Sequence, residues 1–151
     1  MYQNFLRGLY LGGLDLTGKV IDSSAITKFL LKERGWEQVK GFLLERPYTL
    51  ELAVKETTNA IWRRVILLTD ISVEKAFIIL NDLLELKKYL LRVEPQNPYL
   101  SQALKIAIEN KITVYDALFI AQALTKQAAL ISSDEKQCKL AESLNIETIY
   151  I

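Results

Sequence analysis

Apolar positions follow two patterns along the chain: short runs rich in β-branched residues, and longer stretches in which they recur every three to four residues. The short runs predict strands, which cover 20–21, 90–93, 129–132 and 148–151. The longer stretches predict helices, which cover 25–30, 36–43, 52–68, 73–89, 98–108, 114–123 and 140–144. Residues 48–52 are a short extended lead-in to the third helix. Because strands and helices alternate with short connections, the pattern predicts a largely parallel sheet covered by helices on both faces.

The first predicted strand ends at a carboxylate. Asp22 follows Val20 and Ile21, and two typical N-cap residues, Ser23 and Ser24, open the helical pattern behind it. In open α/β sheets, ligands bind at the carboxyl ends of the strands. An acid at this point is therefore better placed for chemistry than one on a helix surface.

Three further carboxylates are candidates by position. Glu56 shares a helical stripe with two alanines, which places it either at the edge of the core or in a cleft. Asp116 lies in the first turn of a predicted helix, where the macrodipole favours an acid and Thr113 can cap, so a structural role is the alternative. Asp134 directly follows a predicted strand. Acids at the ends of two parallel strands can meet across a crevice.

The predicted helix 73–89 is apolar nearly all round. A helix of this kind must be buried on more than one side. In a chain of this size the second side is expected to meet a partner, which is another copy of the chain or a different protein. The alternative is that neighbouring helices of the same chain cover all of it.

The absence of histidine narrows the possible chemistry. With no imidazole among the 151 residues, Ser-His-Asp triads and His-containing metal sites are excluded. The single cysteine, Cys138, excludes a disulfide framework and a multi-Cys zinc site, and it is expected to be a buried, inert thiol. Hydrolytic chemistry would then rest on carboxylates, and all-oxygen ligands select Mg²⁺ or Mn²⁺ over zinc.

Length and patterning predict one folded domain at 19–151, preceded by a glycine-interrupted extension at 1–18 of unclear role. The extension lacks the features of a signal peptide, and no later segment is an uncharged run long enough to span a bilayer. We therefore expect a cytoplasmic protein that makes no membrane contact. The formal net charge is +1. If four acids bind a metal, the rest of the protein surface carries an excess of basic side chains and is mildly basic.

The four acids stand in segments that resemble the PIN-domain family of metal-dependent ribonucleases, and most closely its VapC-type toxins. The segments are VIDSSA at 20–25, ETTNAIW at 56–62, YDALFIA at 115–121 and LISSDEK at 130–136. Each motif alone is weak, but all four in this order and at these intervals are fairly specific. The resemblance covers roughly residues 19 to 151 and implies a three-layer α/β/α sandwich with a central, largely parallel sheet.

The resemblance also implies site residues and partners. Catalytic, metal-binding acids would be Asp22, Glu56, Asp116 and Asp134, and supporting residues would be Ser24, Asn59 and Ser132. The cofactor would be Mg²⁺ or Mn²⁺, the substrate RNA, and the partners a small VapB-type antitoxin and a second copy in a homodimer. Attack of water on phosphorus would leave 5′-phosphate and 3′-hydroxyl ends.

Elementary electrostatics supports a metal. Two carboxylates about 4 Å apart repel by roughly 4 kcal/mol at an effective dielectric constant near 20, and a divalent cation relieves this repulsion. Such a cation also activates bound water and stabilises charge on phosphoryl oxygens. Lys28, Arg63 and Lys136 lie near the acids in sequence and are candidates for RNA phosphate contacts, with ion pairing or solvent exposure as the alternative for each.

Three other functions remain open. A phosphate-accepting receiver-like domain would need a second acid beside Asp22 and a lysine beyond the last strand, and neither is present. A PIN-like interaction module without catalysis would be favoured by the loss of one of the four acids. A PIN nuclease of RNA processing or maturation is barely separable from a toxin by sequence, although the small size favours the toxin.

Overall fold

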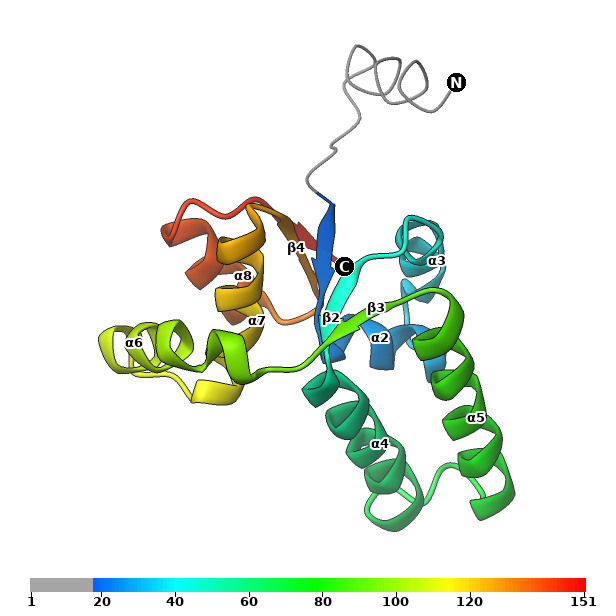
Figure 1. Ribbon diagram of the computed structural model, residues 1–151. Coiled ribbons are helices and arrows are strands. Elements are labelled where there is room, and N and C mark those ends of the chain that lie inside the picture. Colours follow the sequence, from blue (N-terminus) through cyan, green and yellow to red (C-terminus); the bar gives the residue numbers. More distant parts are fainter. Residues whose placement is uncertain (1–17) are drawn as a thin grey trace, which may run out of the picture.

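A single parallel sheet forms the centre of the molecule. The computed structural model describes residues 18–151 (Figure 1). The sheet has five strands, which are β1 (Lys19–Ile21), β2 (Tyr48–Leu50), β3 (Arg92–Glu94), β4 (Ala129–Ser132) and β5 (Thr148–Tyr150). Their order is β3-β2-β1-β4-β5, and every neighbouring pair is parallel. The predicted parallel sheet is confirmed.

Helices cover both faces of the sheet. They are α2 (Ser23–Leu30), α3 (Trp36–Leu44), α4 (Glu51–Ile66), α5 (Val73–Tyr89), α6 (Leu100–Asn110), α7 (Val114–Lys126) and α8 (Glu135–Ser143), with a short 3₁₀ turn at Asn97–Tyr99. Helices α2 to α5 gather on one side, while α7 and α8 lie against the other with α6 packed on α7 (Figure 1). The predicted α/β/α sandwich is confirmed.

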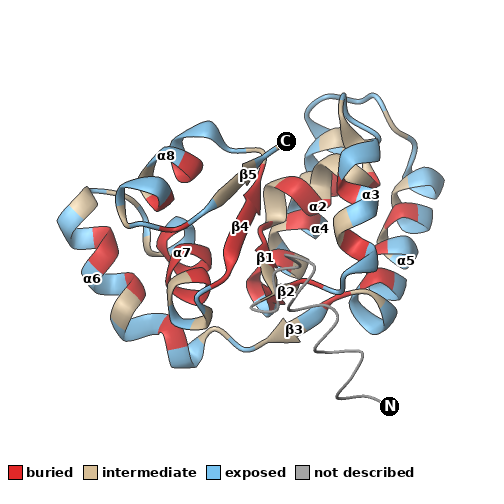
Figure 2. Ribbon diagram, turned by 90° about the horizontal axis from the view of Figure 1, so that it is seen from above, coloured by how far each residue is buried: buried red, intermediate tan, exposed pale blue. Residues whose placement is uncertain are grey.

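The central strands carry the core. All four residues of β4 are buried, as are Val20 and Ile21 of β1, which accounts for their continuous apolar sequence (Figure 2). In the register of this pair, Ile21 lies opposite Ile131, and the Asp22 amide donates to the Ile131 carbonyl at 3.1 Å. Asp22, which follows β1, and Ser132, the last residue of β4, therefore meet at the carboxyl edge of the sheet.

Three local predictions were wrong. The N-cap of α2 is Asp22 itself, whose side chain accepts from the Ala25 amide, and Ser23 and Ser24 are the first helical residues. Tyr48–Leu50 is a strand, because it pairs with both β1 and β3. The predicted strand at 90–93 begins two residues later, and as β3 it is the partly exposed edge of the sheet.

Other local predictions are confirmed. Ser72 and Thr113 cap α5 and α7 by accepting from backbone amides of the first turn. Cys138 is buried, and burial raises the pKa of its thiol, which keeps it protonated and unreactive. No helix within 18–151 has the length and apolar character needed to cross a membrane. The predicted extension lies almost wholly outside the described residues.

Helix α5 is buried on one side only. Ile79, Leu83 and Leu86 face the core, whereas Val73 and Phe77 are exposed. Neighbouring helices of the chain therefore do not cover all of its apolar surface, and the prediction that a partner does so stays open.

Candidate active site

Asp22 is a carboxylate fixed by hydroxyl groups at the carboxyl edge of the sheet. It is 1% exposed. Its Oδ1 accepts from the Ser24 hydroxyl at 2.6 Å and from the Ala25 amide at 3.0 Å, and its Oδ2 accepts from the Ser132 hydroxyl at 2.5 Å. Donors on both oxygens hold the side chain in one orientation. They also favour its ionised form.

The same two hydroxyls join the ends of β1 and β4. The Ser24 oxygen accepts from the Ser133 amide at 2.9 Å, and the Ser132 oxygen accepts from the Asp134 amide at 3.0 Å. A hydroxyl has one proton to donate, and both protons point to Asp22. The two serines thus couple the position of the buried carboxylate to the backbone that carries Asp134.

Burial dominates the titration of Asp22. Loss of hydration, together with the charge of Asp134, raises the pKa of Asp22 from 3.8 to about 6, although the hydrogen bonds from Ser132, Ser24 and Ala25 act in the opposite direction. The folded chain therefore holds a buried negative charge at neutral pH at a cost in stability.

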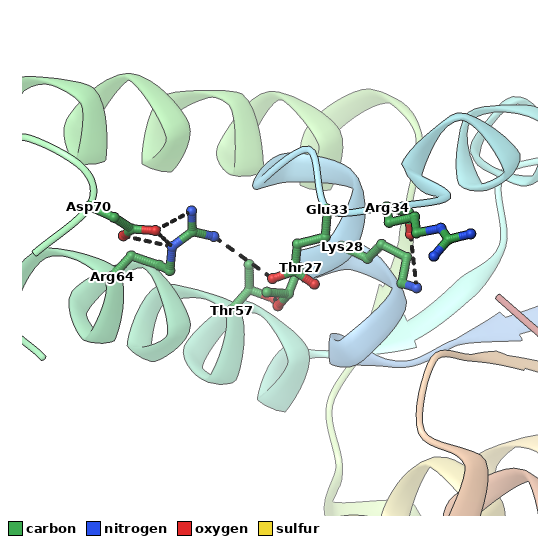
Figure 3. Close-up of polar contacts among 7 residues, drawn as sticks. All are labelled: Thr27, Lys28, Glu33, Arg34, Thr57, Arg64 and Asp70. Atoms are coloured by element: carbon green, nitrogen blue, oxygen red, sulfur yellow. Dashed lines mark hydrogen bonds and ion pairs between the residues drawn. The ribbon is translucent and has the colours of Figure 1, made fainter. Parts of the chain in front are cut away.

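Glu56 comes to the site from α4. Two contacts set its position: the Thr27 hydroxyl of α2 donates to the Thr57 hydroxyl of α4 at 3.3 Å, and Arg64 of α4 pairs with Glu33 in the connection between α2 and α3 (Figure 3). The Ser23 hydroxyl donates to Glu56 Oε1 at 3.2 Å. The first turn of α2 therefore orients a carboxylate that lies 33 residues away in sequence.

The electrostatics of Glu56 links the remaining acids. Partial burial raises its pKa, and the charges of Asp116 and Asp22 raise it further, whereas the hydrogen bond from Ser23 lowers it. Asp134 acts on Asp22 in the same way, so each of the four predicted acids is within electrostatic range of at least one other. Glu56 is thus partly buried and also lines a cleft, so it combines the two placements that the sequence left open.

Asp116 and Asp134 are exposed and stand at helix N-termini. Asp134 is the N-cap of α8, and its Oδ1 accepts from the Lys136 and Gln137 amides. Asp116 lies in the first turn of α7, where its carbonyl accepts from the Gln137 side chain at 3.4 Å. Capping therefore fixes the side chain of Asp134, whereas Asp116 is placed by its backbone, and its amide donates to the Thr113 cap.

A cleft of about 580 Å³ opens beside Glu56. It lies between α2, α4 and the start of α7, and among the residues that line it are Ser24, Asn59, Arg63 and Tyr115. Arg63 is therefore the predicted phosphate contact that faces this space. Lys28 instead donates to the carbonyl of Arg34 (Figure 3).

The donors of the site fit a hard divalent cation. All are oxygens, and the acids repel one another, so that a cation would stabilise their ionised forms. Within 18–151, no group of three or more His, Cys, Asp or Glu side chains is placed so that together they could hold a metal ion. Mg²⁺ in proteins is commonly held by one or two carboxylates and several waters, so an open arrangement of acids is compatible with it.

Sequence reasoning missed several residues of the site. Ser23 was assigned only to capping, and Gln137 was not considered. Lys55 and Tyr115 line the cleft but were not among the predicted site residues. Adjacency to Asp22 and to Asp116 was the available signal for Ser23 and Tyr115. It was insufficient, because their roles depend on how α2, α4 and α7 pack.

The fold and the site together define a class: a parallel α/β/α sandwich with a cluster of carboxylates beside a polar cleft at the carboxyl edge of its sheet. Comparison with known families agrees, since the PIN domain matches residues 19–143. The chain belongs to the PIN-domain family.

Individual relatives give the same result. Ribonuclease VapC3 of Pyrobaculum aerophilum is 31% identical, over 78% of this chain and 89% of that protein. PAE2754 from the same organism shares the fold, with a TM-score of 0.63 and 22% identity over 90% of this chain and 91% of that one. FitAcB from Neisseria gonorrhoeae aligns with a TM-score of 0.56 and 18% identity, over 86% of this chain and 95% of that one. The similarity to VapC3 supports a PIN nuclease, and the two solved structures share its fold.

Proposed function

We propose that the protein is a Mg²⁺- or Mn²⁺-dependent endoribonuclease that hydrolyses RNA phosphodiester bonds, and that it is the toxin of a VapBC-type toxin–antitoxin pair acting in the cytoplasm. The observation that carries the proposal is Asp22, a buried carboxylate held by two hydroxyls within electrostatic range of further acids beside a cleft. The similarity to a VapC ribonuclease supports the choice of substrate.

The residues divide the work according to their environment. Asp22, with both oxygens fixed, and the rim acids Asp116 and Asp134 would hold the cation together with Glu56. The cation, when bound, supplies activated water and stabilises charge on the phosphoryl oxygens. Glu56 lies at the cleft with a raised pKa, which suits it to orient the attacking water and accept its proton.

The substrate phosphates would bind on the α4 side of the cleft. Arg63 lies two turns from Glu56 on the same helix and lines the cleft, as do Lys55 and Asn59. A guanidinium at this place can fix the register of the RNA backbone without reading its sequence. Lys28 and Lys136 stay as further candidates at the margin of the site.

A groove between α4 and α5 supports a protein partner. It measures about 290 Å³, its exposed lining is wholly apolar, and it includes Trp62 and Phe77, which are 50% and 67% exposed. An apolar groove between two helices suits the nonpolar face of a partner helix. We assign it to the antitoxin, because a small antitoxin can insert a segment where a second globular copy cannot.

A line of exposed residues on α6 supports the homodimer. Leu100, Leu104 and Ile108 recur every four residues and are 43%, 51% and 69% exposed. A straight apolar stripe on one helix can pack against its own copy across a twofold axis. The two surfaces are separate, since α6 lies on the α7 side of the sheet and α5 on the other (Figure 1).

Cleavage of a labelled, structured RNA tests the proposed activity. The purified wild type should cut it in millimolar Mg²⁺ or Mn²⁺ and stop on addition of EDTA, and the new ends should carry 5′-phosphate and 3′-hydroxyl groups. Asp22→Asn should abolish cleavage, whereas Asp82→Asn, a matched change on the exposed surface of α5, should not.

Each outcome separates the candidates. Cyclic 2′,3′-phosphate ends would contradict the proposed attack by water. Cleavage undiminished in Asp22→Asn would exclude the carboxylate site, and no cleavage by the wild type would favour an inactive PIN-like interaction module. Cutting confined to ribosomal RNA precursors would favour the alternative role in RNA maturation.

A further inference from the structure

An exposed aromatic ring stands at the cleft and has no part in the chemistry described so far. Tyr115 is in the first turn of α7, immediately before Asp116, and its side chain is 63% exposed. It lines the same cleft as Glu56, Asn59 and Arg63. A tyrosine left largely in water keeps apolar ring surface available to a ligand.

The two walls of the cleft offer different chemistry. Helix α4 contributes the cation of Arg63, the amide of Asn59 and the carboxyl of Glu56, whereas α7 contributes the ring of Tyr115. A nucleotide also has two unlike parts, an anionic phosphate and a flat base. The cleft can therefore hold the backbone on one wall and a base on the other, close to the carboxylates.

We propose that Tyr115 is a stacking platform for one unpaired base next to the bond that is cut. This rests on the proposed ribonuclease function. A base inside a duplex is already stacked between its neighbours, so only an unpaired base can present its face to a protein ring. Tyr115 is then a specificity-determining residue that acts in binding.

Three variants test the platform. Tyr115→Ala removes the ring, Tyr115→Phe keeps it without the hydroxyl, and Tyr150→Ala removes a tyrosine of similar exposure, 60%, on the edge strand β5. The substrate is a fluorescent oligoribonucleotide of mixed sequence, used unpaired and annealed to its complement. Cleavage is measured as KM and kcat, and binding by anisotropy in the inactive Asp22→Asn background.

The ring should matter for binding unpaired RNA. Loss of one base–aromatic stack corresponds to roughly a 5- to 150-fold weaker affinity, so Tyr115→Ala should raise KM within this range while kcat changes little. Tyr115→Phe and Tyr150→Ala should stay within about twofold of the wild type. The annealed substrate should be cut poorly by every variant, with no dependence on Tyr115.

The outcomes distinguish this inference from the proposed function. If the wild type cuts RNA and Tyr115→Ala leaves KM unchanged, the platform is wrong and the nuclease stands. If the wild type binds unpaired RNA through Tyr115 without cutting it, the platform stands and the nuclease is wrong. The platform would also be overturned by equal cleavage of paired and unpaired RNA, or by absence of RNA binding. A change of oligomeric state in Tyr115→Ala would overturn it too, and would indicate that Tyr115 lies at an interface between copies of the chain.

Discussion

Removing the charge of Asp22 should inactivate the protein and at the same time increase its stability. The pKa of this group rises from 3.8 to about 6 on folding, a difference of about 2 pH units, which corresponds to roughly 3 kcal/mol against the folded state at neutral pH. Asn has nearly the same shape as Asp, and its side-chain amide can donate a hydrogen bond to the Ser132 oxygen. The Ser132 hydroxyl can then donate its own proton to the Ser24 oxygen, which lies 3.2 Å away. At 2–4 °C per kcal/mol, Asp22→Asn should melt up to about 10 °C higher at pH 7.5 in EDTA.

The sign of the effect follows from which state ionises first. Below about pH 4 the carboxyl of Asp22 is protonated in both states, and the penalty is absent. As the pH rises from 4 to 6, the unfolded chain loses the proton first and gains stability, so the penalty grows and is complete above pH 6. The gap between variant and wild type should therefore close on acidification.

Thermal melts by circular dichroism from pH 4 to 8, with EDTA, measure this gap directly. Asp82→Asn is the control and should melt with the wild type at every pH. Mn²⁺ should raise the melting temperature of the wild type much more than that of Asp22→Asn, since a ligand that binds only the folded state stabilises it. A gap that does not depend on pH, or an Asp22→Asn protein that melts below the wild type at pH 7.5, would refute the reasoning.

The two partner surfaces give separate predictions. Leu104→Lys should turn a homodimer into a monomer by light scattering, because it places a charge in the middle of the α6 stripe, whereas Leu84→Lys on α5 should not. Phe77→Lys should end co-purification of a co-expressed antitoxin while RNA cleavage persists, because it blocks the α4–α5 groove, and its neighbour Ile78→Lys, outside that groove, should not. Dimers in the first case, or a retained antitoxin in the second, would show that these surfaces serve another purpose.

What the sequence could predict depended on whether the signal was local. The strand, the carboxylate and the helix around Asp22 are consecutive, and the parallel order of strands follows from their alternation with helices. The start of β3 was misplaced because Leu90 and Leu91 are as apolar as a strand. Their amides instead complete the end of α5 by donating to the Leu86 carbonyl, which delays the strand until Arg92.

The contents of the cleft could not be predicted in the same way. Whether Ser23 meets Glu56, and whether Tyr115 faces the cleft, depends on the angle at which α4 and α7 approach α2. That angle is set by side-chain packing across the sheet, for which apolar periodicity gives no direction. Local patterns were thus enough to select the candidate acids, whereas tertiary packing determines which residues surround them.

The first turn of α2 explains why the site is both rigid and costly. Asp22 is at once the cap of this helix and the buried acid, while the two serines after it reach Glu56 on α4 and the end of β4. A carboxylate fixed by hydroxyls stays buried when the site is without a cation, so the loss of its hydration destabilises the fold. The hydrogen bonds that fix Asp22 lower its pKa and only partly offset the effect of burial, so a substitution that removes the buried charge gains stability at the expense of the chemistry that depends on that charge.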